Sequence, residues 1–265
     1  MTSLVAADAS PPAQVSLPRS AWRLAACLAM LVRGLLTCLF IFPFCSPARR
    51  MAHVGRFCDL TLGAMGIRVV TEGAAHPGPV LLAANHVSWL DILAMDAALP
   101  ARFVSKADIR KWPVIGWMVA CGGTLFIERE RKRDAMRVVH QVAASLQDGD
   151  IVAMFPEGTT SDGHGLLPFH ANLLQAAIAT HTPVQAVALR YRDAGSPVSR
   201  AAAFVGEMSL LESLWLIVRA RGLEVQVQRL PAVPTEGWER RALGERLRGD
   251  IATALGIDPS APAHR

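Results

Sequence analysis

From residue 67 onward the chain alternates between short apolar runs and longer mixed segments, and this alternation restricts the fold more than any other feature. The apolar runs have the length of buried strands and lie at 67–70, 80–84, 102–105, 124–128, 151–155, 184–189, 202–206 and 223–228. Helical segments are predicted between them at 89–97, 113–120, 131–147, 170–180, 208–219 and 237–255. Strands that alternate with helices indicate an α/β protein with a largely parallel central sheet flanked by helices.

One of these predicted helices is unusually apolar. The segment "MSLLESLWLIVR" (208–219) carries apolar side chains on most of its faces. A helix of this kind is stable only when it is covered, either by the protein core or by lipid. We expect it to belong to the core, with a second membrane contact as the alternative.

The first 66 residues do not share the alternation. Residues 25–45 are almost wholly apolar except for Arg33 and Gly34 near the middle, and a helix of that length just spans a bilayer. A central arginine is costly in such a span, and residues 46–66 mix apolar with basic positions as an interfacial helix does. We therefore predict a membrane-associated helical hairpin over 19–66, with a single spanning helix as the alternative.

Two boundaries complete the predicted organisation. Residues 1–18 are small, polar and proline-bearing, which is typical of a disordered lead-in. A cleaved signal peptide fits poorly, because the apolar run starts late and no clear small-x-small site precedes a polar mature start. Residues 67–265 then form the α/β domain.

Composition favours contact with lipid. The 265 residues are 52% hydrophobic, and the mean hydropathy of +0.30 is high for a fully soluble protein. Arginines cluster around the apolar N-terminal region and in "RERKR" (129–133), where they suit anionic lipid headgroups. No nucleic-acid motif accompanies this charge, so nucleic acid is not an expected partner.

The cysteines argue against a stapled or metal-bound fold. There are five, an odd number, and none has C-x-x-C spacing. A disulfide framework and a zinc site are therefore not expected, which is consistent with a reducing cytoplasmic environment. We predict no metal and no cofactor.

The stretch "AANHVSWLDILAMD" (83–96) places His86 five positions before Asp91, just after a predicted buried strand. The pattern Ser88-x-x-Asp91 is a capping box at a helix start, so Asp91 by itself is explained by its helix. His86 has no such local explanation. Polar residues at the carboxyl end of a buried strand are where open α/β sheets collect their ligands.

Two further predicted strands are followed by polar residues. Arg129 follows the strand at 124–128, and "PEGTTSDG" follows the strand at 151–155. A solvated charge and a turn are the structural alternatives, whereas the glycine and hydroxyl groups also suit a phosphate. There is no P-loop and no G-x-S-x-G motif, so Ser161 is a poor candidate for a covalent nucleophile.

Taken in order, "NHVSWLD", "GTLFIER", "FPEGTTS" and "TPVQAVAL" resemble the four sequence blocks of the glycerolipid acyltransferase family, which includes 1-acylglycerol-3-phosphate acyltransferases. The resemblance runs from about Ile67 to Leu189. It implies that His86 is the general base and that Asp91 is its partner. This is chemically coherent, because an attacking hydroxyl must lose a proton and imidazole titrates near neutrality.

The resemblance also implies a set of substrate contacts. Arg129 and Glu157 would hold the acceptor's headgroup, Arg129 through charge-assisted hydrogen bonds to phosphate. Gly158 and Thr159 would add donors, and Lys106 would be a second phosphate contact. The fourth block, which contains Pro183, is linked to the acyl chain.

One departure bears on the acceptor. Family members often follow the third block with Pro-Phe-Lys-x-Gly, whereas this chain reads "LPFHANLL" (167–174), with His170 and Asn172 in place of lysine and glycine. Losing a cation near the headgroup brings a phosphate-bearing acceptor into question.

The expected activity is transfer of a fatty acyl group from acyl-CoA or acyl carrier protein to 1-acylglycerol 3-phosphate, at the inner face of the cytoplasmic membrane. Another lysolipid acceptor, such as lyso-ornithine lipid, is the near alternative. A non-catalytic lipid-binding protein is the alternative from a different class, and it would need no base–carboxylate pair.

Overall fold

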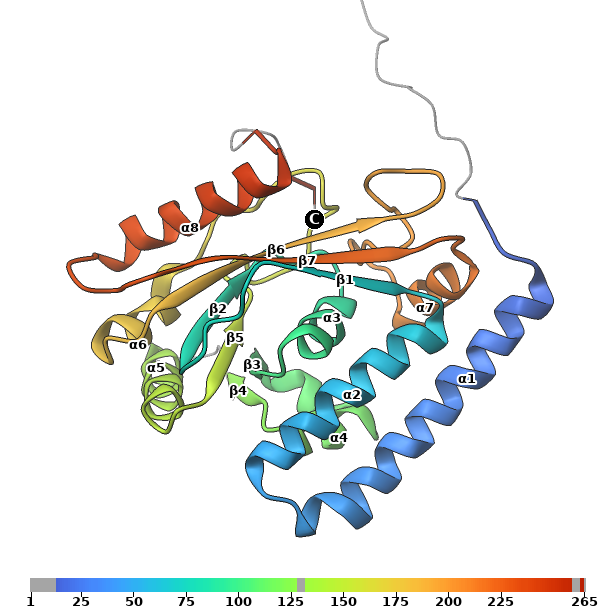
Figure 1. The fold of residues 1–265 in the computed structure, drawn as a ribbon, viewed down its shortest axis with the longest axis horizontal. Coiled ribbons are helices and arrows are strands. Elements are labelled where there is room, and N and C mark those ends of the chain that lie inside the picture. Colours follow the sequence, from blue (N-terminus) through green and yellow to red (C-terminus); the bar gives the residue numbers. More distant parts are fainter. Residues whose placement is uncertain (1–12, 128–131, 259–262, 265) are drawn as a thin grey trace, which may run out of the picture.

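The computed structural model describes residues 13–127, 132–258, 263 and 264, and within them the chain forms a single mixed sheet. The strands are β1 (Arg68–Glu72), β2 (Val80–Ala84), β3 (Arg102–Lys106), β4 (Leu125–Ile127), β5 (Ile151–Met154), β6 (Val184–Arg192) and β7 (Glu224–Val233), in the order β1-β7-β6-β2-β5-β3-β4 (Figure 1). From β6 to β4 all neighbours are parallel. β7 runs antiparallel to β6 and parallel to β1. The prediction of an α/β fold with a largely parallel sheet is confirmed.

Helices cover both faces of this sheet. The α-helices in the described part of the chain are α1 (Leu17–Leu36), α2 (Pro47–Met65), α3 (Leu90–Ala98), α4 (Ile115–Cys121), α5 (Lys132–Gln147), α6 (Leu174–Ala179), α7 (Leu210–Arg219) and α8 (Arg240–Leu255). Short π or 3-10 turns are η1 (Thr37–Ile41), η2 (Phe42–Phe44), η3 (Ala107–Lys111) and η4 (Ala171–Leu173). All six helices predicted after residue 67 are present, with ends shifted by a few residues.

The sheet separates two hydrophobic cores. Successive side chains of a strand point to opposite faces, and β2 shows this directly. Val80, Leu82 and Ala84 pack into the core covered by α2, α3 and α7, whereas Leu81 and Ala83 pack into the core covered by α5, α6 and α8. Every residue of β2 is buried, as expected for a central parallel strand.

Seven of the eight predicted strands form, and the prediction at 202–206 is wrong. This segment is apolar because it is buried, with Ala202 fully inaccessible, but it folds as a loop. The Phe204 N–H donates to the Val87 carbonyl at 3.0 Å, and the Phe204 carbonyl accepts a hydrogen bond from the Thr160 hydroxyl. Its backbone groups are therefore satisfied by two loops at the sheet's edge and not by a neighbouring strand.

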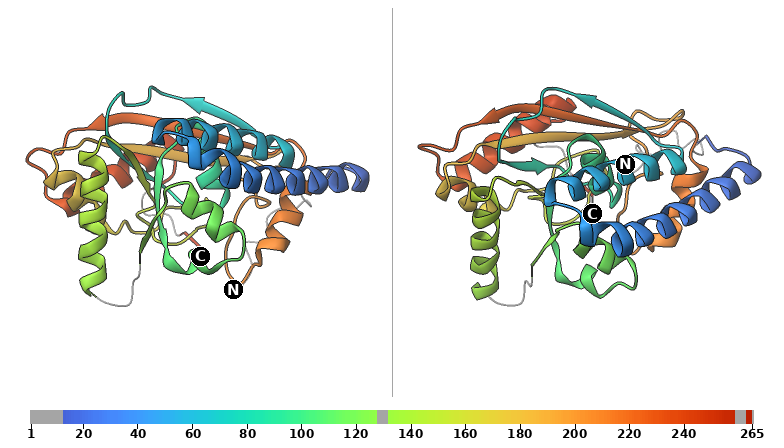
Figure 2. Two further views of the ribbon diagram at one scale, coloured as in Figure 1. Left: turned by 90° about the horizontal axis from the view of Figure 1, so that it is seen from below. Right: turned by 60° about the horizontal axis from the view of Figure 1, so that its bottom comes forward.

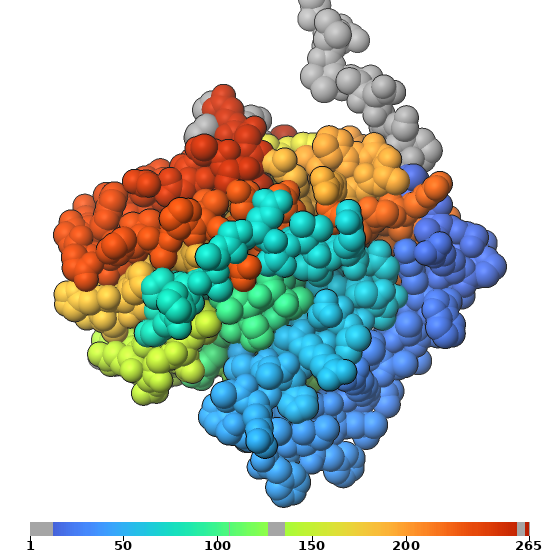
Figure 3. Space-filling view, viewed as in Figure 1, coloured from blue at the N-terminus to red at the C-terminus, as the bar shows by residue number. Residues whose placement is uncertain are grey.

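The chain before the sheet forms a helical hairpin. Residues Leu17–Phe44 make one helical stretch that is long and apolar enough to cross a membrane, and it contains an 18-residue window with a mean hydropathy of 2.3, of which only 11% is buried. The chain then turns, and α2 returns alongside α1, so that the two helices form one flank of the molecule (Figures 1 and 3). The exposed outer face of the first stretch carries the large apolar side chains Trp22, Leu28, Val32, Leu36, Leu39, Phe40 and Phe44.

A buried arginine fixes α1 to the rest of the fold. The Arg23 guanidinium donates through Nη1 to the carbonyl oxygens of Val218, at 2.9 Å, and Ala220, at 2.8 Å, at the end of α7. Gly66, which ends α2 with φ +82°, makes room for it, because a Cβ there would lie 2.2 Å from the guanidinium carbon. Just before α1, the Val15 N–H also donates to the Arg219 carbonyl at 2.8 Å. The hairpin and α7 are therefore joined by backbone and buried side-chain hydrogen bonds.

The apolar helix α7 has two different faces. Ile217 and Val218 are fully buried, so the prediction that this segment contributes to the core is confirmed. Leu211, in contrast, is 77% exposed. Ser209 begins the helix with a complete capping box to Glu212.

Candidate active site

Polar residues follow several parallel strands at one edge of the sheet. His86 lies two residues beyond the end of β2, and Glu157 lies three residues beyond the end of β5. Because β2, β5 and β3 are parallel neighbours, their carboxyl ends meet at the same edge. The structure therefore brings together the two loops that carry His86 and Glu157.

His86 and Asp91 are in direct contact. The distance from His86 Nδ1 to Asp91 Oδ2 is 2.8 Å, and the His86 side chain is 18% exposed while that of Asp91 is inaccessible. A carboxylate accepts only if Nδ1 carries the proton, so this contact fixes the tautomer. It leaves Nε2 as the nitrogen that can take a proton from a substrate.

The Asp91 carboxylate is held by more than His86. Its Oδ2 also accepts hydrogen bonds from the backbone N–H groups of Val87, at 2.7 Å, and Ser88, at 2.9 Å. Oδ1 accepts a hydrogen bond of 2.7 Å from the Tyr191 hydroxyl. Asp91 thus holds the two amides before α3 and contacts the histidine at once, but the Ser88 hydroxyl has no hydrogen-bond partner within the described part of the chain, so only half of the predicted capping box forms. Buried charge of this kind is stable only when its lone pairs are satisfied.

Glu157 is bonded to the main chain of the histidine. It is 2% exposed, and its Oε1 accepts from the His86 N–H at 2.7 Å while its Oε2 accepts from the Leu167 N–H at 2.9 Å. Burial raises the pKa of the Glu157 carboxyl to about 7, and the two N–H groups oppose that shift. Both carboxylate oxygens face the protein backbone, so Glu157 sets the position of the His86 main chain.

Other contacts restrict the histidine further. Its ring stacks on Phe155, with centroids 4.0 Å apart and an interplanar angle of 8°. The His86 carbonyl accepts from the Ser161 N–H at 2.8 Å. The ring is therefore held on one face by an aromatic side chain and the main chain is held on both sides, which suits a group that must be oriented for proton transfer.

The loop after β5 is a tight turn. Gly158 has φ +71°, and its N–H donates to the Phe155 carbonyl at 3.1 Å, so that amide is already used within the turn. Thr159 is partly buried beside it. The structure places both residues at the same edge as His86.

The remaining predicted site residues differ in their position relative to His86. Lys106 ends β3, whose carboxyl end lies at the edge that carries His86. Arg129 lies outside the described residues, between the end of β4 and the start of α5 in the chain. Pro183 is not brought to this edge, because its carbonyl accepts from the Leu81 N–H at the opposite, amino end of β2 and β6.

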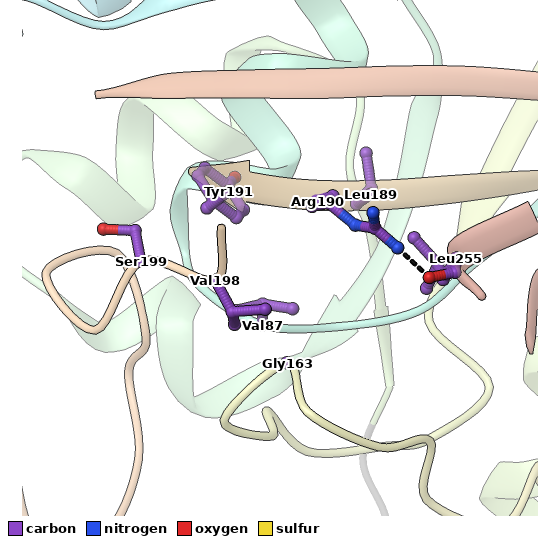
Figure 4. Close-up of a pocket in the computed structure, with 8 residues that line it drawn as sticks. All are labelled: Val87, Gly163, Leu189, Arg190, Tyr191, Val198, Ser199 and Leu255. Atoms are coloured by element: carbon purple, nitrogen blue, oxygen red, sulfur yellow. Dashed lines mark hydrogen bonds between the residues drawn. The ribbon is translucent and has the colours of Figure 1, made fainter. Parts of the chain in front are cut away.

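Nothing in the described part of the chain groups three or more histidine, cysteine or acidic side chains in a way that would hold a metal ion. A small cavity lies beside Tyr191, lined also by Val87, Gly163 and Leu189 (Figure 4). Its volume of about 10 Å³ has room for one water molecule and not for a substrate.

Sequence reasoning missed Tyr191 and Phe155. Tyr191 is the single tyrosine of the chain and lies two residues beyond the predicted end of its strand. β6 is longer than predicted and carries the hydroxyl to Asp91. Phe155 ends a predicted strand and begins the third block, but no local pattern shows that its ring packs on His86.

Comparison with known proteins identifies the family of this chain. Residues 66–190 match the family model described as "Acyltransferase". The chain is 41% identical over 196 residues to a 1-acyl-sn-glycerol-3-phosphate acyltransferase of Neisseria gonorrhoeae, covering 73% of this chain and 76% of the relative. It is 37% identical over 192 residues to a lyso-ornithine lipid O-acyltransferase of Pseudomonas aeruginosa, covering 72% and 74%.

A solved structure shares the fold. The crystal structure of the 1-acyl-sn-glycerophosphate acyltransferase PlsC from Thermotoga maritima aligns with a TM-score of 0.66, covering 90% of this chain and 96% of that one at 18% identity.

Proposed function

The chain belongs to the acyltransferase family, and we propose that it transfers a fatty acyl group from acyl-CoA or acyl carrier protein to the free hydroxyl of a lysolipid. The proposed acceptor is 1-acylglycerol 3-phosphate, which gives phosphatidic acid. The observation that carries this proposal is the 2.8 Å contact between His86 Nδ1 and Asp91 Oδ2 at the open edge of the sheet.

The proposed mechanism follows from that contact. His86 Nε2 takes the proton of the acceptor hydroxyl as its oxygen attacks the carbonyl carbon of the acyl thioester. Asp91 stabilises the imidazolium that forms, as in a triad without a serine. The carbon–sulfur bond then breaks, and the imidazolium returns the proton to the departing thiolate. The products are an ester and a free thiol.

We assign the predicted headgroup contacts as follows. Arg129 and Lys106 bind the acceptor phosphate, and the turn of Gly158 and Thr159 lies beside it. Two contacts that the resemblance implies stay predictions: that of Glu157 with the acceptor and that of Pro183 with the acyl chain. The buried Glu157 carboxylate and the position of Pro183 at the amino end of β6 favour indirect roles for both.

The experiment that tests the function uses purified full-length protein in detergent with labelled acyl-CoA or acyl carrier protein. The acceptors are 1-acylglycerol 3-phosphate, lyso-ornithine lipid and lysophosphatidylcholine. We expect transfer to the first acceptor and its loss in His86→Ala, by a factor on the order of a hundred to ten thousand. Most of the activity persisting in His86→Ala would refute the assignment of the base.

The acceptor is tested separately. If it carries phosphate, Arg129→Ala raises its KM steeply, by no more than the few kcal/mol of a charge-assisted contact, and leaves the donor's KM unchanged. Arg241→Ala, which removes an exposed arginine of α8, is the matched control. The alternative outcome is that lyso-ornithine lipid is a good acceptor and 1-acylglycerol 3-phosphate a poor one. In that case His170 and Asn172 mark a change in acceptor specificity.

We further propose that the hairpin holds the enzyme on the cytoplasmic face of the cytoplasmic membrane. The exposed apolar side chains of the Leu17–Phe44 stretch support this, and apolar burial is insensitive to salt. High salt should therefore extract little protein from membranes, whereas detergent should release it. Quantitative release by salt alone would overturn the buried hairpin.

A further inference from the structure

Aromatic side chains are exposed on the catalytic domain itself, outside the hairpin. Trp112 and Val114, between η3 and α4, are each 43% exposed, and Trp117 on α4 is 44% exposed. The residues just before them, Arg110 and Lys111, are exposed and basic. Large apolar side chains that gather in this way on a soluble surface usually mark an interaction site.

A second group lies on α7. Leu211 is 77% exposed and Trp215 is 39% exposed, on a helix whose other face supplies Ile217 to the core. We call Trp112, Val114, Trp117, Leu211 and Trp215 together the apolar rim.

Both parts of the rim are tied to the candidate active site. η3 begins directly after β3 ends, so α4 starts from the edge of the sheet that carries His86. In the second part, Ser213 on α7 accepts a 3.0 Å hydrogen bond from Trp89 Nε1. Trp89 lies three residues after His86 in the chain. Figure 2 shows α4, in green, and α7, in orange, on the same side of the sheet.

The rim is also continuous with the apolar hairpin. Gly34 on α1 packs so closely on α4 that a Cβ there would lie 2.3 Å from Met118 Cε. At its other end, α1 is bonded to α7 through Arg23. One helix with an exposed apolar face therefore contacts both helices of the rim.

We propose that the apolar rim inserts to headgroup depth in the same membrane leaflet as the hairpin, so that the bilayer surface meets the catalytic edge of the sheet. This inference rests on the proposed transfer to a lysolipid and on the proposed membrane contact of the hairpin. Tryptophan side chains are enriched at the level of lipid headgroups, and Arg110 would face anionic phosphates there, whereas Lys111 is paired with Asp108 at 3.2 Å. A lysolipid would then move from the leaflet to His86 without crossing open water.

The test follows tryptophan fluorescence of the full-length protein on vesicles of phosphatidylethanolamine and phosphatidylglycerol with brominated acyl chains, which quench tryptophans in contact with lipid. The triple variant Trp112→Phe, Trp117→Phe, Trp215→Phe keeps the rim apolar but removes its fluorescence. We expect the fluorescence lost on adding brominated lipid to be smaller by roughly twofold or more in this variant. The strongly exposed tryptophan that the variant retains is Trp22 of the hairpin. Trp238→Phe, at a position packed against the core beneath α8, is the matched control and should leave the quenched intensity unchanged.

The outcomes separate the rim from the hairpin. Unchanged quenching in the triple variant would overturn the rim proposal while leaving the hairpin in lipid through Trp22. No quenching of the wild-type protein would overturn both membrane proposals.

Activity supplies a second measurement. In Trp112→Ser, Trp117→Ser, transfer to a lysolipid in vesicles should fall by about tenfold, the scale of losing partial burial of two large apolar side chains. Transfer to the same lysolipid in detergent micelles should stay within about twofold of wild type, because no membrane surface must be met there. Equal activity of variant and wild type on vesicles, or an equal loss in both formats, would contradict the proposal. Activity in micelles reports the proposed acyl transfer independently.

Discussion

The hydroxyl of Tyr191, near the end of β6, donates a 2.7 Å hydrogen bond to Asp91 Oδ1, although the two residues are 100 positions apart in the chain. Tyr191 is 2% exposed, and its hydroxyl bonds Asp91 and not the imidazole ring. It acts through Asp91, whose other oxygen faces the histidine, and is therefore a positioning residue. Tyr191→Phe should lower kcat by roughly ten- to a hundredfold, since hydrogen bonds to charged groups contribute about 1.5–3 kcal/mol, and should leave both KM values nearly unchanged.

Steady-state kinetics and thermal unfolding of the same samples check this. Ser213→Ala is the control, because it removes a buried hydrogen bond to Trp89 beside α3 but none to Asp91. We expect a comparable loss of stability in both variants and a loss of kcat only in Tyr191→Phe. Equal kinetics in the two variants would mean that Tyr191 serves stability alone.

Asp91→Asn should fold normally and lose most of its activity. An asparagine oxygen can still accept from the Val87 and Ser88 N–H groups, so the loop that leads into α3 keeps these two hydrogen bonds. The amide carries no charge to stabilise an imidazolium, and a loss of roughly a hundred- to ten-thousandfold in kcat follows from the roles of carboxylate and base in a triad. Circular dichroism confirms folding, and full activity in this variant would show that capping is the whole role of Asp91.

Glu157→Gln separates two roles for the third block. In the wild type the two carboxylate oxygens accept from the backbone N–H groups of His86 and Leu167. In the variant one oxygen is replaced by an NH2 group, which donates and cannot accept, so one of these two N–H groups loses its partner. An unsatisfied buried group costs about 1–3 kcal/mol, so stability and kcat should both fall while the acceptor's KM stays constant. A steep rise in the acceptor's KM at constant stability would instead support direct contact with the headgroup, as the sequence resemblance implies.

A buried carboxyl on α3 makes stability depend on pH. Asp96 accepts from the Ala101 N–H at 2.9 Å and faces the Cys58 thiol, and burial raises the pKa of Asp96 to about 7. The folded state therefore keeps a proton that the unfolded chain releases near its ordinary pKa. The free energy of unfolding should fall as pH rises from the ordinary pKa of this carboxyl to about 7.

Asp96→Asn should flatten that dependence without a loss of activity at low pH. The change is a few kcal/mol at most, because each unit of pKa difference is worth about 1.4 kcal/mol. Part of the dependence remains, since the pKa of Glu157 is raised in the same direction. Thermal unfolding in detergent between about pH 5 and pH 8 measures it, and a variant with the same slope as wild type would exclude Asp96 as a source.

The strands and their parallel arrangement were predictable because β2 and β5 are short, continuous apolar runs between helical segments. The segment 202–206 has the same composition and is a loop, since apolar content reports burial and not backbone pairing. The antiparallel entry of β7 between β1 and β6 depends on contacts across the whole chain. No local pattern encodes that.

The candidate site divides in the same way. His86 and Asp91 are five residues apart, so one loop can join them and a sequence motif can identify them. The roles of Tyr191 and Glu157 depend on strands that are adjacent only in space, at separations of 100 residues from Asp91 and 71 residues from His86. Glu157 could be identified only through the family motif, Tyr191 was not identified at all, and no local pattern gives the partner of either residue.

The buried guanidinium of Arg23 has a consequence for how this enzyme can be made. It bonds the end of α7, while Leu62 and Met65 of α2 lie within the core beneath the sheet. Removing the hairpin should therefore expose the interior and yield unfolded or aggregated protein, not a separate catalytic domain. The two N-terminal helices are a structural part of the α/β fold and not an appendage to it.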